Sequence, residues 1–155
     1  MGNFDFWQRW LLVVGIIVSF FGLFMSFFNG TALFAMFDSL INPVFWGTGP
    51  LPGEAKEFQK WIYGAWGATV AGWGIFIIFI AGNPFKKKEK WSWHCLWSGL
   101  LLWFIVDTGF SAYFRVYINV GLNTLLFLAV LVPVFFTRKQ FAMPPRNCEA
   151  PTIEN

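Results

Sequence analysis

The sequence predicts an all-α membrane protein, a four-transmembrane-helix bundle with a short outer amphipathic interfacial helix. Of its 155 residues, 57% are apolar and only 12% are charged, whereas soluble domains carry about 25% charged residues. Four stretches are apolar over the roughly 20 residues that a helix needs to cross a bilayer. Period-two alternation is absent and four strands could not close a barrel, so the spans must be helices. This composition argues against a soluble enzyme, a nucleic-acid-binding domain and a disulfide scaffold.

The four predicted spans form one membrane domain, residues 1–137. They cover residues 10–28, 61–81, 91–112 and 116–137. The Asn83-Pro84 pair closes the second span, because proline lacks the amide proton that would continue a helix. In the fourth span, Pro133 removes one backbone bond and frees the carbonyl of Ala129. Residues 138–155 are polar and rich in proline, and we expect them to be a mobile cytoplasmic tail.

The distribution of basic residues predicts the orientation of the spans. With the N-terminus inside, only three of the eleven Lys and Arg residues fall outside, Lys56, Lys60 and Arg115. Cytoplasmic loops are the ones enriched in Lys and Arg, so both termini are placed in the cytoplasm. One inner loop is strongly basic, and we expect it to rest on anionic lipid headgroups at the membrane surface. Its members are Lys86, Lys87, Lys88 and Lys90.

The segment between the first two spans contains an amphipathic helix. Its apolar residues recur at helical spacing, with polar residues on the other side. The apolar positions are Leu33, Met36, Phe37, Leu40 and Ile41. Thr31 is a candidate N-cap, and the Asn42-Pro43 pair predicts the end of the helix. We expect this helix to pack on the surface in the outer headgroup plane, with a lid over the mouth of the bundle as the alternative.

Small residues on the second span predict where another helix packs closely. Gly64, Ala68 and Gly72 are spaced by four residues, and Gly67 and Ala71 form a neighbouring pair. Small side chains on one face let a second backbone approach. We expect this contact to lie within the bundle, with a homodimer seam as the alternative.

The predicted ligand or partner site is built around Asp107, the one charged residue inside a span. Charges within spans are rare and by default face a cavity or a partner. If the last two spans turn near Arg115, Asp107 lies at the depth of Asn123, and Ser111 at the depth of Asn119. The Asp107 layer would be about 12 Å below the outer turn. Arg115 at the rim could reach inward and complete the site.

Two interpretations of these polar residues remain open. The cluster could bind a proton, a cation or a polar headgroup. It could also do no more than join two helices through hydrogen bonds, which average about 0.6 kcal/mol each in membrane bundles.

Motifs for catalysis and for cofactors are missing from the sequence. His94 is the single histidine, so one chain cannot supply two histidines to a haem or form a histidine-rich metal site. His94 and Asp107 would be about 19 Å apart along a helix, too far for an acid–base pair. Cys95 and Cys148 fall on the predicted cytoplasmic side, where thiols stay reduced. We therefore predict no catalytic residue, no cofactor and no metal.

Two segments, WIYGAWGATVAGWG at residues 61–74 and WFIVDTGFS at residues 103–111, carry a resemblance to known proteins. From the second span through residues 138–141, about half of the chain resembles a group of small four-helix bacterial membrane proteins. No activity is assigned to that group, so the resemblance implies only a location in the bacterial inner membrane.

Three functions are compatible with these features. The first is a non-catalytic binding or accessory module, whose outer-leaflet polar site around Asp107 takes a lipid-like or small ligand or another membrane protein. The alternative is a small proton- or cation-coupled transporter that uses Asp107. A further alternative is a lipid-modifying membrane enzyme, for which the chain lacks a nucleophile–base pair. Membrane lipids are expected partners and nucleic acid is not, and a homo-oligomer is left open.

Overall fold

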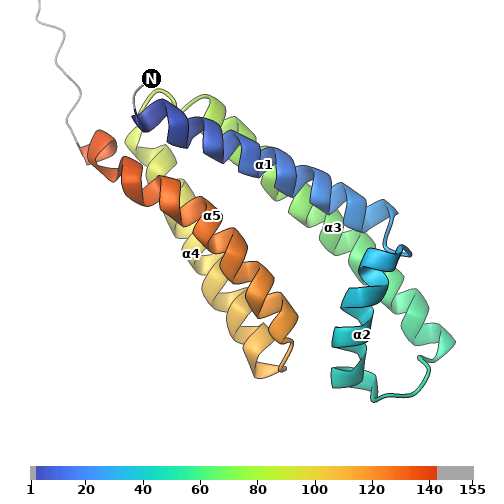
Figure 1. The fold of residues 1–155 in the computed structure, drawn as a ribbon. Coiled ribbons are helices and arrows are strands. Elements are labelled where there is room, and N and C mark those ends of the chain that lie inside the picture. The colour runs from blue at the N-terminus through green and yellow to red at the C-terminus, as the bar shows by residue number, and fades with distance from the viewer. Residues whose placement is uncertain (1–2, 143–155) are drawn as a thin grey trace, which may run out of the picture.

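A computed structural model of the protein describes residues 3–142, which form five α-helices (Figure 1). The helices are α1 (Asn3–Phe27), α2 (Ala32–Trp46), α3 (Gly53–Gly82), α4 (Lys90–Tyr113) and α5 (Tyr117–Ala142). All of them except α2 are long and apolar enough to cross a membrane. The predicted all-α bundle of four spans with one short additional helix is therefore confirmed, and the protein is an integral membrane protein.

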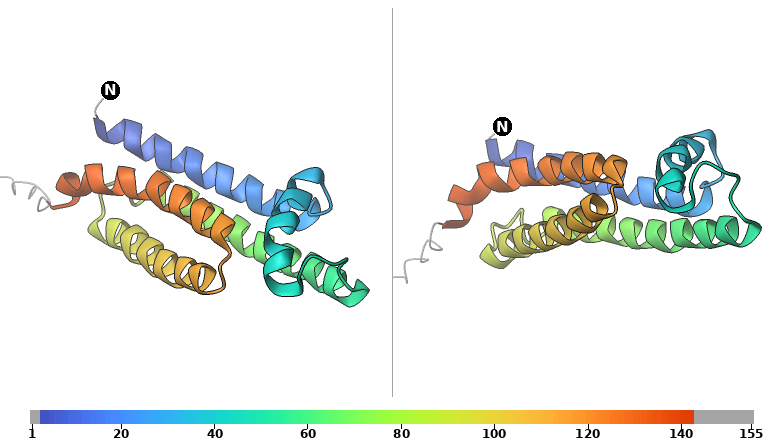
Figure 2. Two further views of the ribbon diagram at one scale, coloured as in Figure 1. Left: turned by 60° about the horizontal axis from the view of Figure 1, so that its bottom comes forward. Right: turned by 90° about the horizontal axis from the view of Figure 1, so that it is seen from below.

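The four long helices are arranged as two pairs. Helix α1 packs along α3, and α4 packs against α5 in an antiparallel hairpin. The pairs meet at the end that holds the beginning of α1 and the end of α5, and they diverge toward the other end (Figures 1 and 2). We call the first the inner end and the second the wide end. Helix α2 lies at the wide end, beside α3 and facing the turn between α4 and α5.

An aromatic cluster holds the two pairs together at the inner end. The ring of Phe85 is fully buried and lies 5.7 Å from that of Phe4 and 4.7 Å from that of Phe141. Phe141 is helical, so α5 runs five residues past the predicted end of the last span. The prediction that the mobile tail begins at residue 138 is wrong for residues 138–142, because burial of Phe141 stabilises another turn. The remainder of the predicted tail lies outside the described residues.

The closest helix contact is between α1 and α3, and it uses the neighbouring pair Gly67 and Ala71 rather than the stripe of Gly64, Ala68 and Gly72. A Cβ on Gly22 would lie 2.3 Å from the amide nitrogen of Ala71, and one on Gly67 would lie 2.5 Å from the carbonyl oxygen of Gly22. Added at Gly74, it would lie 2.4 Å from the amide nitrogen of Ser19. Because these distances are to backbone atoms, only glycine allows the two helices to approach so closely.

The stripe of Gly64, Ala68 and Gly72 is not the face that α1 covers, although the carbonyl of Gly64 accepts a hydrogen bond from Ser26 of α1 at 3.0 Å. A Cβ at Gly64 or Gly72 would meet no atom of the described residues within 4 Å, and Ala68 is exposed. The physical reason is that α1 offers its own small residues, Gly15, Ser19, Gly22 and Ser26. These match the stripe that contains Gly67, Ala71 and Gly74.

Helix α2 packs on the wide end through one face and is longer than predicted. Phe34 is only 1% exposed and lies 5.3 Å from the ring of Tyr63. Pro43 lies inside the helix rather than at its end, so the predicted end at Asn42-Pro43 is wrong. The missing amide costs one backbone bond, and the further turn brings Phe45 to 5.9 Å from Phe114. Thr31 occupies the N-cap position but makes no side-chain cap hydrogen bond.

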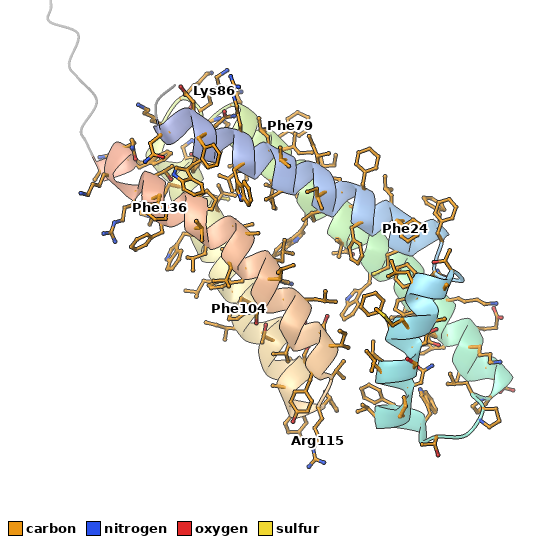
Figure 3. All side chains as sticks on the ribbon, viewed as in Figure 1. Phe24, Phe79, Lys86, Phe104, Arg115 and Phe136 are labelled. Carbon is orange, nitrogen blue, oxygen red and sulfur yellow. The ribbon has the colours of Figure 1, made fainter. Side chains whose placement is uncertain are left out.

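The outward surface of the bundle is apolar, as a lipid-facing surface requires. Phe79 is 70% exposed and points away from the helices (Figure 3). Phe20, Phe76 and Leu125 are also largely exposed. In water such a surface would drive aggregation, whereas in a bilayer it contacts acyl chains.

Candidate functional site

The α4–α5 hairpin brings Asp107, Ser111, Asn119 and Asn123 together, and we call these four residues the polar cluster. The side-chain amide of Asn119 donates to Asp107 Oδ1 at 2.8 Å, and that of Asn123 donates to the same oxygen at 2.9 Å. Asn119 also donates to Ser111 Oγ at 2.8 Å. The hydroxyl of Ser111 donates to the backbone carbonyl of Asp107 at 2.7 Å. The two polar layers expected from equal distances to the turn are therefore present in the fold.

Arg115 does not join the polar cluster. It lies in the turn between α4 and α5 with a φ of 62°, and its side chain points away from the hairpin (Figure 3). The left-handed backbone of the turn fixes this direction, which the sequence spacing alone did not reveal. The expectation that Arg115 completes the site is not supported by its placement.

The hydrogen bonds of the polar cluster use one oxygen of the Asp107 carboxyl group. An ionised carboxylate only accepts hydrogen bonds, so both asparagines must present their amide nitrogens to it. The second amide proton of Asn123 is directed to Thr108 Oγ1 at 3.3 Å. Among residues 3–142, no side chain donates to Asp107 Oδ2.

A cavity of about 840 Å³ lies against the polar cluster, between the two helix pairs. Its polar wall consists of Asp107, Ser111 and Asn119, whereas Asn123 is 6% exposed and lies behind them. The opposite wall comes from α3, with Trp66 and Trp73. Most of the remaining lining is apolar and comes from α2, α4 and the α4–α5 turn: Ile41, Phe45, Leu102, Trp103, Val106, Phe110, Phe114 and Val116.

A second set of polar residues attaches α2 to α3 beside this cavity. The hydroxyl of Tyr63 donates to Asp38 Oδ1 at 2.6 Å, and the amide of Gln59 donates to the same oxygen at 2.9 Å. The side-chain amide of Gln59 also donates to Asn42 Oδ1 at 2.8 Å. With α2 attached to α3 in this way, Ile41 and Phe45 are held at the wall of the cavity.

A tryptophan of α1 joins the two pairs by a hydrogen bond at the inner end. The indole N–H of Trp10 in α1 donates to the carbonyl of Ala129 in α5 at 2.9 Å. Trp93 in α4 donates to the carbonyl of Val134 in α5 at 2.9 Å, so this second bond lies within the α4–α5 pair. Since the pairs are joined here and diverge at the wide end, the cavity is confined to the half of the molecule that contains α2.

Three residues of this region, Thr108, Trp66 and Trp73, were not among the predicted site residues. Thr108 follows Asp107 directly and could have been found from the same hairpin register. Trp66 and Trp73 could not, because their contribution depends on how the α1–α3 pair sits against α4. Trp73 and Trp103 meet across the two pairs with ring centroids 5.7 Å apart.

The other candidate groups lie apart from the cavity. His94 is an exposed residue in the first turns of α4, near the inner end, and Cys95 beside it is also exposed. Within residues 3–142, no group of three or more His, Cys, Asp and Glu side chains could hold a metal ion.

Comparisons with protein-family models, with curated proteins and with solved structures found no match. The function of the chain has to be inferred from the geometry of the polar cluster and the cavity.

Proposed function

We propose that this protein is a non-catalytic binding module that holds a lipid-like or small ligand in the cavity beside Asp107. The observation that carries the proposal is the placement of three polar side chains on one wall of an otherwise apolar space. Ligand sites typically have volumes of about 300–1,000 Å³, mostly apolar walls and a few convergent polar groups. At about 840 Å³ the cavity falls in this range.

The free oxygen of Asp107 supports binding over a purely structural role. If the polar cluster only joined α4 to α5, a carboxyl group with both oxygens engaged by the neighbouring helix would serve best. Instead, the amide groups of both asparagines donate to Oδ1, and Asp107 is one of the residues that line the cavity. A ligand with a hydrogen-bond donor or a positive charge could engage Oδ2 without breaking the bonds within the cluster.

We further propose a bacterial inner-membrane location with the inner end in the cytoplasm. The first turn of α1, the last turn of α5 and the loop with Lys86, Lys87, Lys88 and Lys90 all lie at this end (Figure 1). The ammonium group of Lys88 is 5.0 Å from the ring centre of Phe4. Basic residues prefer the cytoplasmic side, and there they could contact anionic headgroups. The cavity would then lie in the outer leaflet.

Native mass spectrometry of the protein purified in mild detergent tests the binding proposal. We expect a bound small molecule to copurify with the unmodified chain, and to be reduced in D107N, which keeps the shape of the side chain but removes its charge. S98A changes a residue of the same helix that does not line the cavity, so it is the matched control and should retain the ligand. If the unmodified chain carries no ligand, or if D107N carries as much as S98A, the proposal is wrong.

A small proton- or cation-coupled transporter is the second candidate. It is favoured by the divergence of the two pairs from a joined inner end, with the acid in the opening, as a carrier open to one side would require. Uptake into proteoliposomes driven by a pH gradient, and abolished in D107N, would favour transport. Binding without uptake would favour the module.

A further inference from the structure

We propose that the ligand of the cavity is a lipophilic organic cation, with its positive centre between Asp107 and the aromatic side chains. This inference rests on the proposed binding function and names the chemical class of the ligand. It follows from the charge of the cavity, from the nature of its walls and from its depth in the membrane.

The charge of the cavity selects a cation. Asp107 is the one charged residue that lines it, and no Lys, Arg or His side chain among residues 3–142 does so. The nearest basic residue in the chain, Arg115, points away (Figure 3). A carboxylate removed from water is costly unless it is paired, and the neighbouring donors Ser111, Asn119 and Asn123 supply hydrogen bonds to Oδ1 but no positive charge. An organic cation would supply the missing charge, and an anionic head would be repelled.

The walls of the cavity suit a cation that is large and weakly hydrated. Six of the lining residues are aromatic: Phe45, Trp66, Trp73, Trp103, Phe110 and Phe114. The faces of aromatic rings, those of tryptophan above all, attract cations and recognise ammonium groups that carry alkyl substituents. A small inorganic cation would need several oxygen ligands, and among the residues that line the cavity only Asp107, Ser111 and Asn119 carry side-chain oxygens. Leu102 and Val106 leave apolar space for the hydrophobic part of the molecule.

The depth of Asp107 disfavours a zwitterionic phospholipid. Asp107 is six residues from the end of α4 at Tyr113, which corresponds to about 9 Å along the helix. A phospholipid that placed its ammonium group there would draw its phosphate below the headgroup region. Within the described residues 3–142, no basic side chain lines the cavity to receive that phosphate. A molecule with a single positive charge and no phosphate avoids the cost of placing a phosphate in the apolar part of the membrane.

A pair of ions that differ almost only in charge provides the test. Binding of labelled tetraphenylphosphonium and of tetraphenylborate would be measured with the full chain in lipid nanodiscs, after subtraction of binding to empty nanodiscs. We expect saturable binding of the cation with at least tenfold preference over the anion. D107N should weaken binding of the cation at least tenfold, W103L should weaken it several-fold, and S98A should leave it unchanged.

A charge-conserving variant separates loss of charge from loss of fold. D107E should bind the cation more tightly than D107N, and circular dichroism would show whether each variant is folded. If D107N does not fold, the preference for the cation and the effect of W103L still decide the outcome. Octadecylamine in the lipid should compete if the ligand comes from the membrane, and a water-soluble tetraalkylammonium ion should compete if it comes from solution. Failure of both competitors would contradict the inference.

The result also distinguishes the two proposals. If both ions bind equally, or if the anion binds more tightly, and W103L weakens that binding, the cavity is a binding site but the assignment to cations is wrong. If neither ion nor any copurified molecule binds in a way that depends on Asp107 or Trp103, both proposals are wrong.

Discussion

The indole N–H of Trp10 donates a hydrogen bond to the carbonyl oxygen of Ala129, and Pro133 is the reason that this oxygen is free. In a regular helix the carbonyl of Ala129 would accept from the amide of residue 133, which proline lacks. Trp10 replaces that donor from α1 at 2.9 Å. Within a membrane an unpaired carbonyl is costly, so this bond both satisfies α5 and joins the two helix pairs at the inner end.

Replacement of Trp10 by phenylalanine should therefore destabilise the protein through an unpaired carbonyl. We expect W10F to lower the free energy of unfolding by about 1 kcal/mol. In a P133A background the amide of residue 133 can donate to the carbonyl oxygen of Ala129. W10F should therefore reduce the free energy of unfolding by less in that background. Unfolding of the four chains of this double-mutant cycle in detergent would measure the coupling. An equal cost of W10F in both backgrounds would contradict the assigned role.

Two glycine-to-alanine substitutions in the long helices should have opposite effects. In G22A the new methyl group would lie 2.3 Å from a backbone nitrogen of α3, so α1 and α3 must separate, at about 1–3 kcal/mol. In G72A the methyl group would meet no atom of the described residues within 4 Å. The higher helix propensity of alanine should then stabilise the protein by up to about 1 kcal/mol. Thermal unfolding in detergent would compare them. Similar destabilisation by both would indicate that the stripe with Gly72 is also a contact surface.

The hydrogen bond between Asn123 and Asp107 should contribute strongly to the free energy of unfolding. N123L removes a buried donor at 2.9 Å from the carboxyl group, and we expect a loss of about 1–3 kcal/mol. In the double variant D107L/N123L the carboxyl group is removed together with its amide donor, so no buried charge is left unpaired. The double variant should therefore be more stable than the sum of the two single effects implies. Simple additivity in chemical unfolding would argue against a coupled cluster.

Attachment of α2 should depend on the hydroxyl group of Tyr63. Y63F removes the 2.6 Å bond to Asp38, so we expect faster hydrogen exchange across α2 with little change in α4 and α5. Y113F is a suitable control, because the side chain of Tyr113 is 78% exposed. Unchanged exchange in α2 of Y63F would show that the contacts of Phe34 alone hold this helix.

The sequence was sufficient for features that depend on one helix or one hairpin. The spans follow from apolar length. The pairing of Asp107 with Asn123 follows from counting residues on either side of one turn. The free carbonyl of Ala129 follows from the covalent structure of Pro133. Each is local, so no knowledge of the other helices was needed.

Features that depend on distant pairs of helices were not predicted. Helix α3 carries two stripes of small residues, and the choice between Gly67 and Gly72 depends on the matching stripe of α1. The cavity arises because the pairs diverge, and the hydropathy of the individual spans contains no information about that angle. For the same reason Trp66 and Trp73 could be read only as membrane-embedded residues and not as a wall opposite Asp107.

Photoaffinity labelling in membranes tests the binding site most directly. A hydrophobic ammonium compound that carries a diazirine would be added to membranes containing the protein, and the modified residues would be mapped by mass spectrometry. We expect labelling to concentrate on Trp66, Trp103 and Val106 and to fall in D107N but not in S98A. Labelling spread over lipid-facing residues such as Phe76 and Leu125, and unaffected by D107N, would contradict a binding site beside Asp107.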